Sequence, residues 1–139
     1  MELGGNSGIF FRAVEGPERI YMGAPEMQIL DDENHPDGRS ALTSAGSNFG
    51  LHPTPRHLAR PVGEWNTVRI LVNGDHVEHW LNGVRTVEYE LHSADWLERV
   101  AGSKFKEWPE YGQASRGHIG LQDHGDRVAF RSIKIRQLP

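Results

Sequence analysis

The chain has 139 residues and a mass of 15.6 kDa, enough for one domain with its own core but not for two. Hydrophobic residues make up 37% and charged residues 24% of the chain, a composition that excludes intrinsic disorder. The net charge is −4 and acidic and basic residues are interspersed, so we expect neither a nucleic acid nor an anionic membrane as partner.

Two further absences narrow the function. The sequence contains no cysteine, which excludes disulfides, thiolate nucleophiles and sulfur-ligated metals. No apolar run approaches the roughly 18 residues of a membrane-spanning helix. The opening residues 1–6 are not typical of a signal peptide, so the sequence leaves the localisation of the chain open.

The first third of the chain predicts two short strands and a long connection. Residues 8–12 and 27–30 are apolar runs of strand length. Residues 31–61 show little periodicity and contain Pro36, Pro53 and Pro55 before the closing Pro61. We therefore expect a long surface excursion here, and loops of this length are usually either functional or wrongly assigned.

The clearest pattern lies between residues 67 and 91. Three runs of alternating apolar residues are separated by the dipeptides Asn73-Gly74 and Asn82-Gly83. Asn-Gly readily takes the positive φ values of a tight hairpin turn. The pattern therefore predicts an antiparallel meander of three strands.

The last third predicts one helix and a second hairpin. Ser93 is a suitable N-cap, and Gly102 a suitable end, for a short helix. Residues 119–121 alternate like a strand, and after the loop 123–126 the stretch 128–135 resumes the pattern. Together these elements predict an all-β fold, an antiparallel β-sandwich with one short helix.

Strand alternation also assigns residues to faces. If Met27 points into the core, Glu26 and Gln28 point to the opposite face. In the same way, a buried Ile119 and Leu121 would turn His118 and Gln122 outward. If these strands are neighbours, a glutamate, two glutamines and a histidine share one face of a sheet.

Six segments, in this order, resemble the 3-keto-disaccharide hydrolase family: residues 5–12 (GNSGIFFR), 25–31 (PEMQILD), 61–66 (PVGEWN), 77–83 (VEHWLNG), 117–125 (GHIGLQDHG) and 130–135 (FRSIKI). The resemblance implies a concanavalin-like jelly roll, a bacterial origin and, for many members, export from the cytoplasm. It covers residues 1–139 as a single domain corresponding to roughly the C-terminal two-thirds of a usual family domain, without the family's first strands.

The resemblance also implies a reaction, the hydrolysis of glycosides already oxidised to a ketone at C3 of the sugar. The ketone makes the C2 proton acidic, so that a base removes it, the group at C1 departs and water adds to the enone. This chemistry needs a general base, an acid for the leaving oxygen, and donors or a cation for the enolate.

The family motifs and the strand faces together nominate the site residues. The candidate catalytic residues are Glu26, His118 and His124, and the candidate substrate-binding residues are Arg12, Gln28, Asp31, Trp80, Lys104 and Gln122. Each has an alternative interpretation: a salt bridge for Arg12, a turn cap for Asp31, a covered surface position for Trp80, and solvated or turn positions for the others.

Other polar residues favour structural interpretations. His79 shares the parity of Val77 and Leu81, which predicts a buried, hydrogen-bonded histidine. The histidines lack the close spacing of a transition-metal site. No cofactor is required by the sequence, although Asp31 and Asp32 are candidate ligands for a Ca²⁺ ion.

Two other functions stay open, a non-catalytic carbohydrate-binding module and an inactive fragment of the family domain. For the hydrolase and for the binding module, the expected substrate or ligand is a carbohydrate or an oxidised glycoside. Without the first strands of the family, apolar residues such as Ile9 and Phe11 would be uncovered, and exposed edges recruit other chains. We therefore expect a homo-oligomer; the alternative is a monomer in which residues 31–61 cover the gap.

Overall fold

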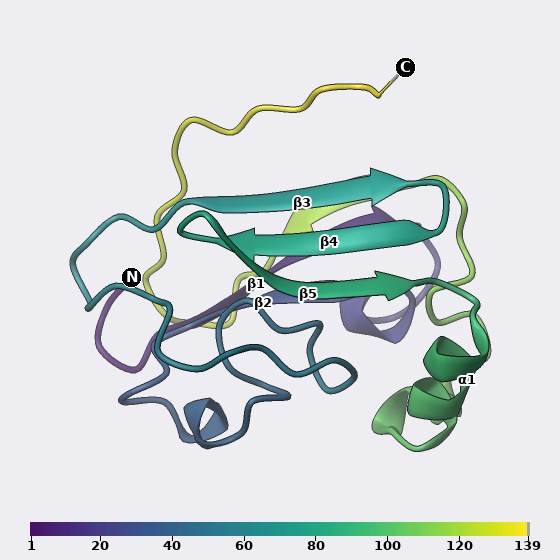
Figure 1. Cartoon of the computed structure of the whole chain (residues 1–139), viewed down its shortest axis with the longest axis horizontal. Helices are drawn as coiled ribbons and strands as arrows, with labels where there is room; N and C mark the ends of the chain where they lie inside the picture. The colour runs from purple at the N-terminus through teal and green to yellow at the C-terminus, as the bar shows by residue number, and fades with distance from the viewer. Residues whose placement is uncertain (139) are drawn as a thin grey trace.

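The computed structural model describes residues 1–138 and contains two antiparallel sheets that lie one over the other (Figure 1). The first sheet has the strand order β2-β1-β6, with β1 at Asn6–Ala13, β2 at Glu26–Leu30 and β6 at His118–Leu121. The second has the order β3-β4-β5, with β3 at Val68–Asn73, β4 at His76–Leu81 and β5 at Val84–Glu90. The predicted antiparallel sandwich is confirmed.

The meander of the second sheet turns where the Asn-Gly pairs predict it. Asn73 pairs with His76 and Leu81 pairs with Val84, so that each turn has a two-residue loop. Gly74 and Gly83 have φ values of +59° and +82°, which a glycine adopts without strain.

One α-helix, α1 at Ala94–Ala101, follows the meander as predicted. The Ser93 hydroxyl accepts a hydrogen bond from the Trp96 N–H at 3.2 Å, and Gly102 ends the helix. Three short 3₁₀ helices complete the chain: η1 at Ile20–Met22, η2 at Pro36–Arg39 and η3 at Lys104–Glu107.

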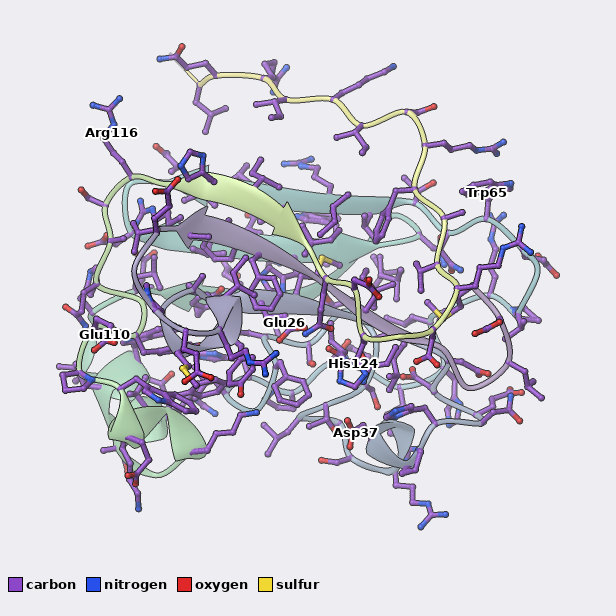
Figure 2. The ribbon with its side chains drawn as sticks, turned by 180° about the vertical axis from the view of Figure 1, so that it is seen from behind. Glu26, Asp37, Trp65, Glu110, Arg116 and His124 are labelled. Atoms are coloured by element: carbon purple, nitrogen blue, oxygen red, sulfur yellow. The ribbon has the colours of Figure 1, made fainter. Side chains whose placement is uncertain are left out.

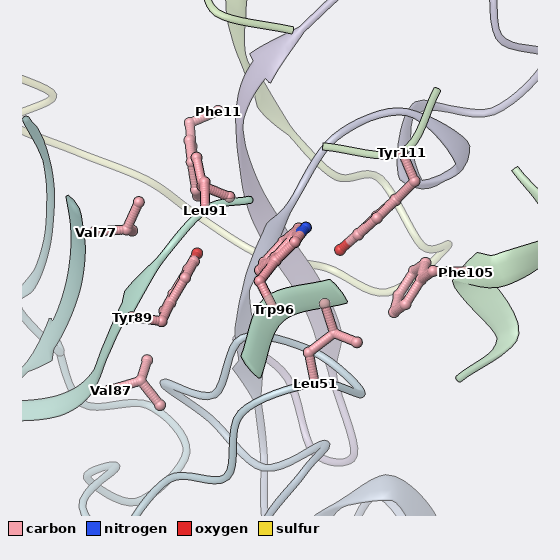
Figure 3. Packing of buried hydrophobic residues seen from close by; sticks show 9 residues of the cluster. All are labelled: Phe11, Leu51, Val77, Val87, Tyr89, Leu91, Trp96, Phe105 and Tyr111. Carbon is pink, nitrogen blue, oxygen red and sulfur yellow. The ribbon is translucent and has the colours of Figure 1, made fainter. Parts of the chain in front are cut away.

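The main core lies between the second sheet, α1 and the loops beside them. It is built largely from aromatic residues of β1, β5, α1 and the following segment (Figure 3), namely Phe11, Tyr89, Trp96, Phe105 and Tyr111, with Leu51, Val77, Val87 and Leu91. Several of these rings stack in sequence, which fixes α1 and η3 against the sheet.

His79 is buried in this interior, as its parity predicts. Its Nε2 lies 3.3 Å from the Tyr89 hydroxyl, and burial lowers the pKa of His79 to about 3. The imidazole is therefore neutral and structural.

Residues 31–61 are not the surface excursion that their composition predicts. Their central part, 44–48, is buried and lies along the free edge of β2. The Gln28 N–H donates to the Ser47 carbonyl, and the Gly46 N–H donates to the Gln28 carbonyl. The segment therefore extends the sheet by backbone hydrogen bonds that the sequence pattern does not reveal.

The predicted second hairpin is wrong. β6 forms, but residues 122–138 contain no strand: the chain does not turn back to pair with β6, whose one strand partner is β1 within the described residues. Ile119 and Leu121 were expected in the core, yet they are 52% and 43% exposed, because nothing in residues 1–138 covers their side of this edge strand.

Within the same residues, the helices are too short or too polar to cross a membrane.

Candidate functional site

A cavity of about 580 Å³ opens on the face of the first sheet that points away from the second sheet. Its lining comes from β1, β2, the loop after β6, and three loops that fold over the sheet, and consists of Asn6, Arg19, Ile20, Tyr21, Glu26, Gln28, Asp37, Phe49, Lys104, Gln122, Asp123 and His124. Glu26 and His124 lie on the near side of the molecule in Figure 2.

The Glu26 side chain lies over the backbone of Gly8 on the neighbouring strand. A Cβ atom at Gly8 would collide with the Glu26 carboxylate, so only glycine leaves room for it. Glu26 is 5% exposed, and its burial raises the pKa of the carboxyl from 4.5 to about 8, although the charge of Lys104 lowers it in part. Glu26 is therefore mostly protonated at neutral pH and is able to donate a proton.

Gln28 lies two residues along the same face and is 1% exposed. Its amide nitrogen donates to the Asn6 side-chain oxygen at 3.1 Å. This bond fixes the orientation of both amides at the cavity wall, so their remaining polar atoms are held in place for a ligand.

Gln122 continues the wall from the end of β6. Its backbone N–H donates to the Gly8 carbonyl at 2.9 Å, and its carbonyl accepts from the Ser7 hydroxyl at 2.7 Å. Its side-chain Oε1 is buried and has no hydrogen-bond partner within residues 1–138. An unpaired buried oxygen in a cavity wall is a ready acceptor for a ligand hydroxyl.

Lys104 supplies the positive charge of the site. Its ammonium lies above three aromatic rings, 4.7 Å from the centroid of Phe49, 5.2 Å from Tyr21 and 5.3 Å from Phe105. Contacts of this kind hold a flexible lysine in one place without neutralising it. The charge is therefore available to a developing negative charge in the cavity.

The histidine of the site stands on the loop after β6. Asp123 accepts the Gly125 N–H at 3.0 Å, which tightens the turn that carries His124. His124 is exposed and lines the cavity together with Asp123. An imidazole at this place is within reach of a ligand in the cavity.

The structure does not bring His118 and Arg12 into this cavity. His118 is exposed at the start of β6, opposite Ala13, and its side chain is not among the lining residues. The backbone of Arg12 has φ +54° at an irregularity in the β1–β6 pairing, and its guanidinium donates to the Gly74 carbonyl and pairs with Asp75. The salt-bridge alternative therefore describes Arg12 correctly.

Asp31 acts as a turn cap. Its carboxylate accepts the N–H groups of Gly4 at 2.8 Å and Glu33 at 3.2 Å, and the side-chain amide of Asn34 at 2.8 Å. Burial raises its pKa, but these hydrogen bonds outweigh burial and lower the pKa overall. Asp32 accepts the Ala45 N–H at 2.8 Å. Both oxygens of Asp31 thus already accept hydrogen bonds, which disfavours Asp31 as a ligand for a Ca²⁺ ion.

Trp80 lies on the opposite side of the molecule from the cavity, on the outer face of the second sheet. Its indole N–H donates to Glu78 at 2.7 Å, and the Arg69 guanidinium lies 5.2 Å from its ring centroid. Trp80 is thus a covered surface residue, as its alternative interpretation states.

Several lining residues escape sequence reasoning. Arg19 and Tyr21 come from the segment after β1, and Asp37 comes from η2. Loop residues of this kind carry no periodicity that would place them on a face. Asn6 belongs to a family-like motif, and its position two residues before Gly8 is the one signal by which it could have been found.

The groups that meet in the cavity suit acid–base chemistry beside a developing negative charge. They comprise a protonated carboxyl, an imidazole, a lysine cation and two oriented amides. The class of protein is therefore an antiparallel β-sandwich with a cavity for acid–base chemistry on the outer face of one sheet. The chain belongs to the family described as the 3-keto-alpha-glucoside-1,2-lyase-like domain, whose profile matches residues 1–136.

Relatives support this membership. The chain is 37% identical over 158 aligned positions to a 3-keto-disaccharide hydrolase of Bacteroides thetaiotaomicron, covering 97% of this chain and 54% of that protein. A crystal structure of a putative glycosyl hydrolase from Parabacteroides distasonis superposes with a TM-score of 0.81 at 31% identity, over 90% of this chain and 60% of that one. A second structure of a putative glycosyl hydrolase from the same organism superposes with a TM-score of 0.60 at 26% identity. That match covers 65% of this chain and 46% of the other. The chain thus spans about half the length of the curated relative.

Proposed function

We propose that this chain carries the active site of a glycoside-cleaving hydrolase whose substrates are glycosides with a ketone at C3. The observation that carries the proposal is the buried Glu26 carboxyl, with a pKa of about 8, in one cavity with Lys104, His124 and free amide oxygen. The relatives, named as a 3-keto-disaccharide hydrolase and as glycosyl hydrolases, support the same reaction class.

In the first step of the proposed mechanism, His124 takes the proton from C2 of the sugar. The electron pair moves onto the C3 oxygen and forms an enolate. Lys104 and the amide side chain of Gln28 stabilise this negative charge, which is the largest contribution expected from a preorganised site. The positive charge of Lys104 is available to the enolate because contacts with aromatic rings do not neutralise it.

In the second step the enolate reforms the ketone and expels the group at C1. The C1–O bond breaks and Glu26 gives its proton to the departing oxygen. Water then adds to the C1–C2 double bond: the Glu26 carboxylate takes a proton from water, the hydroxyl binds C1, and the protonated His124 returns a proton to C2. Both side chains end in their starting states.

The test is turnover of a 3-keto glucoside beside the same glucoside without the ketone. Only the ketone should react, and Glu26→Gln and His124→Ala should each lower its turnover at least about tenfold. Glu98→Gln, which removes one exposed carboxylate on α1, is the matched control and should leave the rate unchanged.

Three results count against the proposal. Equal rates in both site variants and the wild type remove Glu26 and His124 from the mechanism. Retention on a sugar column without turnover identifies a carbohydrate-binding module instead. Neither turnover nor retention identifies an inactive fragment.

A further inference from the structure

A second hollow, of about 510 Å³, adjoins the cavity on the side of α1. It lies between the segment that covers β2 and the connection from α1 to η3, and it is lined by Leu42, Thr43, Phe49, Gly50, Leu51, Arg99, Gly102, Ser103, Lys104 and Phe105. No role in the mechanism above uses this hollow.

The hollow borders the cavity, and two residues belong to both linings. Phe49 and Lys104 line both spaces. The Phe49 N–H donates to the Glu26 carbonyl at 3.0 Å, which places this wall directly beside the proposed acid. A group that leaves C1 and receives the Glu26 proton therefore has the hollow as a neighbouring space.

The walls of the hollow are apolar. Leu42, which is 39% exposed, and the half-buried Phe49 supply its accessible aliphatic and aromatic surface, whereas Leu51 and Phe105 are each only 2% exposed. Gly50 has φ +72°, and a Cβ atom there would lie 3.3 Å from the Phe105 ring, so the Gly50 backbone packs closely against that ring, which is 2% exposed. Apolar surface of this kind gains by covering an apolar ligand.

Polar side chains in the lining are already engaged within the protein. The Thr43 hydroxyl donates to the Asp37 carbonyl at 2.5 Å, and the Ser103 hydroxyl donates to the Val100 carbonyl at 2.9 Å. Arg99 donates to the Leu51 carbonyl at 3.0 Å and to Asp95 at 2.7 Å. A second sugar brings several hydroxyl groups that need partners, and this lining offers it few.

We propose that the hollow binds the leaving group of the glycoside and that this group is an aromatic or similarly apolar aglycone instead of a second sugar. The inference rests on the proposed function for the orientation of the substrate. The sugar occupies the cavity with its C1 oxygen toward Glu26, and the aglycone packs between Leu42 and the ring of Phe49.

Binding tests the subsite without turnover. Titration calorimetry compares p-nitrophenyl glucoside with methyl glucoside, neither of which carries the ketone, in both anomers. The wild type should bind the better p-nitrophenyl anomer at least about tenfold more tightly than its methyl counterpart, since a buried aryl ring is worth more than about 1.4 kcal/mol. Equal affinities for the two ligands overturn the proposal.

A variant then locates the effect. Leu42→Asp places a charge in the hollow without touching the cavity lining, and it should abolish the p-nitrophenyl preference while leaving methyl glucoside binding unchanged. Leu97→Asp is the matched control, because Leu97 is an exposed leucine on α1 outside both spaces. A preference that survives Leu42→Asp overturns the assignment to this hollow.

Turnover separates this inference from the proposed function. With the ketone present, kcat/KM should be at least about tenfold higher for an aryl 3-keto glucoside than for a 3-keto disaccharide, and Leu42→Asp should remove that ratio. Higher kcat/KM for the disaccharide overturns the aglycone inference while the proposed function stands. An aryl binding preference without turnover of either ketone supports the subsite and refutes the proposed function.

Discussion

Replacing Glu26 with glutamine should make the protein more stable, increasingly so as the pH rises. The unfolded chain releases the Glu26 proton near 4.5, whereas the folded chain retains it up to a pKa of about 8. Between these values the folded state binds more protons than the unfolded state, so this carboxyl lowers the stability of the wild type as the pH rises. Glutamine has a similar shape and does not ionise, and it therefore escapes that loss.

The size of the effect follows from the pKa difference. Each pH unit between 4.5 and 8 corresponds to about 1.4 kcal/mol, so the gain in unfolding free energy is about 3 kcal/mol at pH 7 and about 5 kcal/mol above pH 8. Below pH 4.5 the two proteins should differ little, because the carboxyl is then protonated in both states.

Urea unfolding of the wild type and Glu26→Gln at pH 5, 7 and 9 measures this difference. Using the difference between the two proteins removes the contributions of the other titrating groups. Glu98→Gln provides the control for losing one surface carboxylate, and its difference from the wild type should not grow with pH. A Glu26→Gln difference that is flat from pH 5 to 9, or of opposite sign, would refute the reasoning.

The remaining predictions concern the same site and the C-terminal segment. Turnover should fall as the pH rises through about 8, where Glu26 loses its proton, and Lys104→Met should move that fall to higher pH, because the Lys104 charge lowers the Glu26 pKa; a pH profile unchanged by the substitution contradicts this. Gly8→Ala should cost about 1–3 kcal/mol of stability in urea unfolding through collision with Glu26, whereas Gly102→Ala, which has room, should cost less. Light scattering at micromolar concentration should show an oligomer with at least twice the monomer mass of 15.6 kDa. Ile133→Asp should lower this mass, because Ile133 is an apolar side chain that is 65% exposed. A single 15.6 kDa species in the wild type rejects self-association.

Local patterns carried much of the fold. Asn73-Gly74 and Asn82-Gly83 specify two-residue turns, because the positive φ they need belongs to the dipeptide itself. Ser93 caps α1 through a hydroxyl three residues from its donor. Such interactions span a few residues, and a sequence therefore displays them directly.

The candidate site was accessible to sequence reasoning in part. Glu26 and Gln28 were placed on one face by period-two alternation, and a family-like motif pointed to Gln122 and His124. These four residues and the candidate Lys104 all line the cavity. The same motifs also pointed to residues that lie elsewhere. A residue of a family motif can serve the fold instead of a ligand, and Arg12, which holds the turn at Gly74 and Asp75, is an example.

What the tertiary structure alone decided was which surfaces are covered and which loops meet. The alternating pattern predicted that Ile119 and Leu121 are buried. Burial, however, requires another element to cover them, and residues 1–138 supply none at that place. Conversely, residues 44–48 show no strand pattern and are buried, because backbone hydrogen bonds to β2 hold them irrespective of side-chain order. Long-range packing of this kind brought loop residues to Glu26, formed the cavity and buried the carboxyl, and this burial raises its pKa, a property no local pattern encodes.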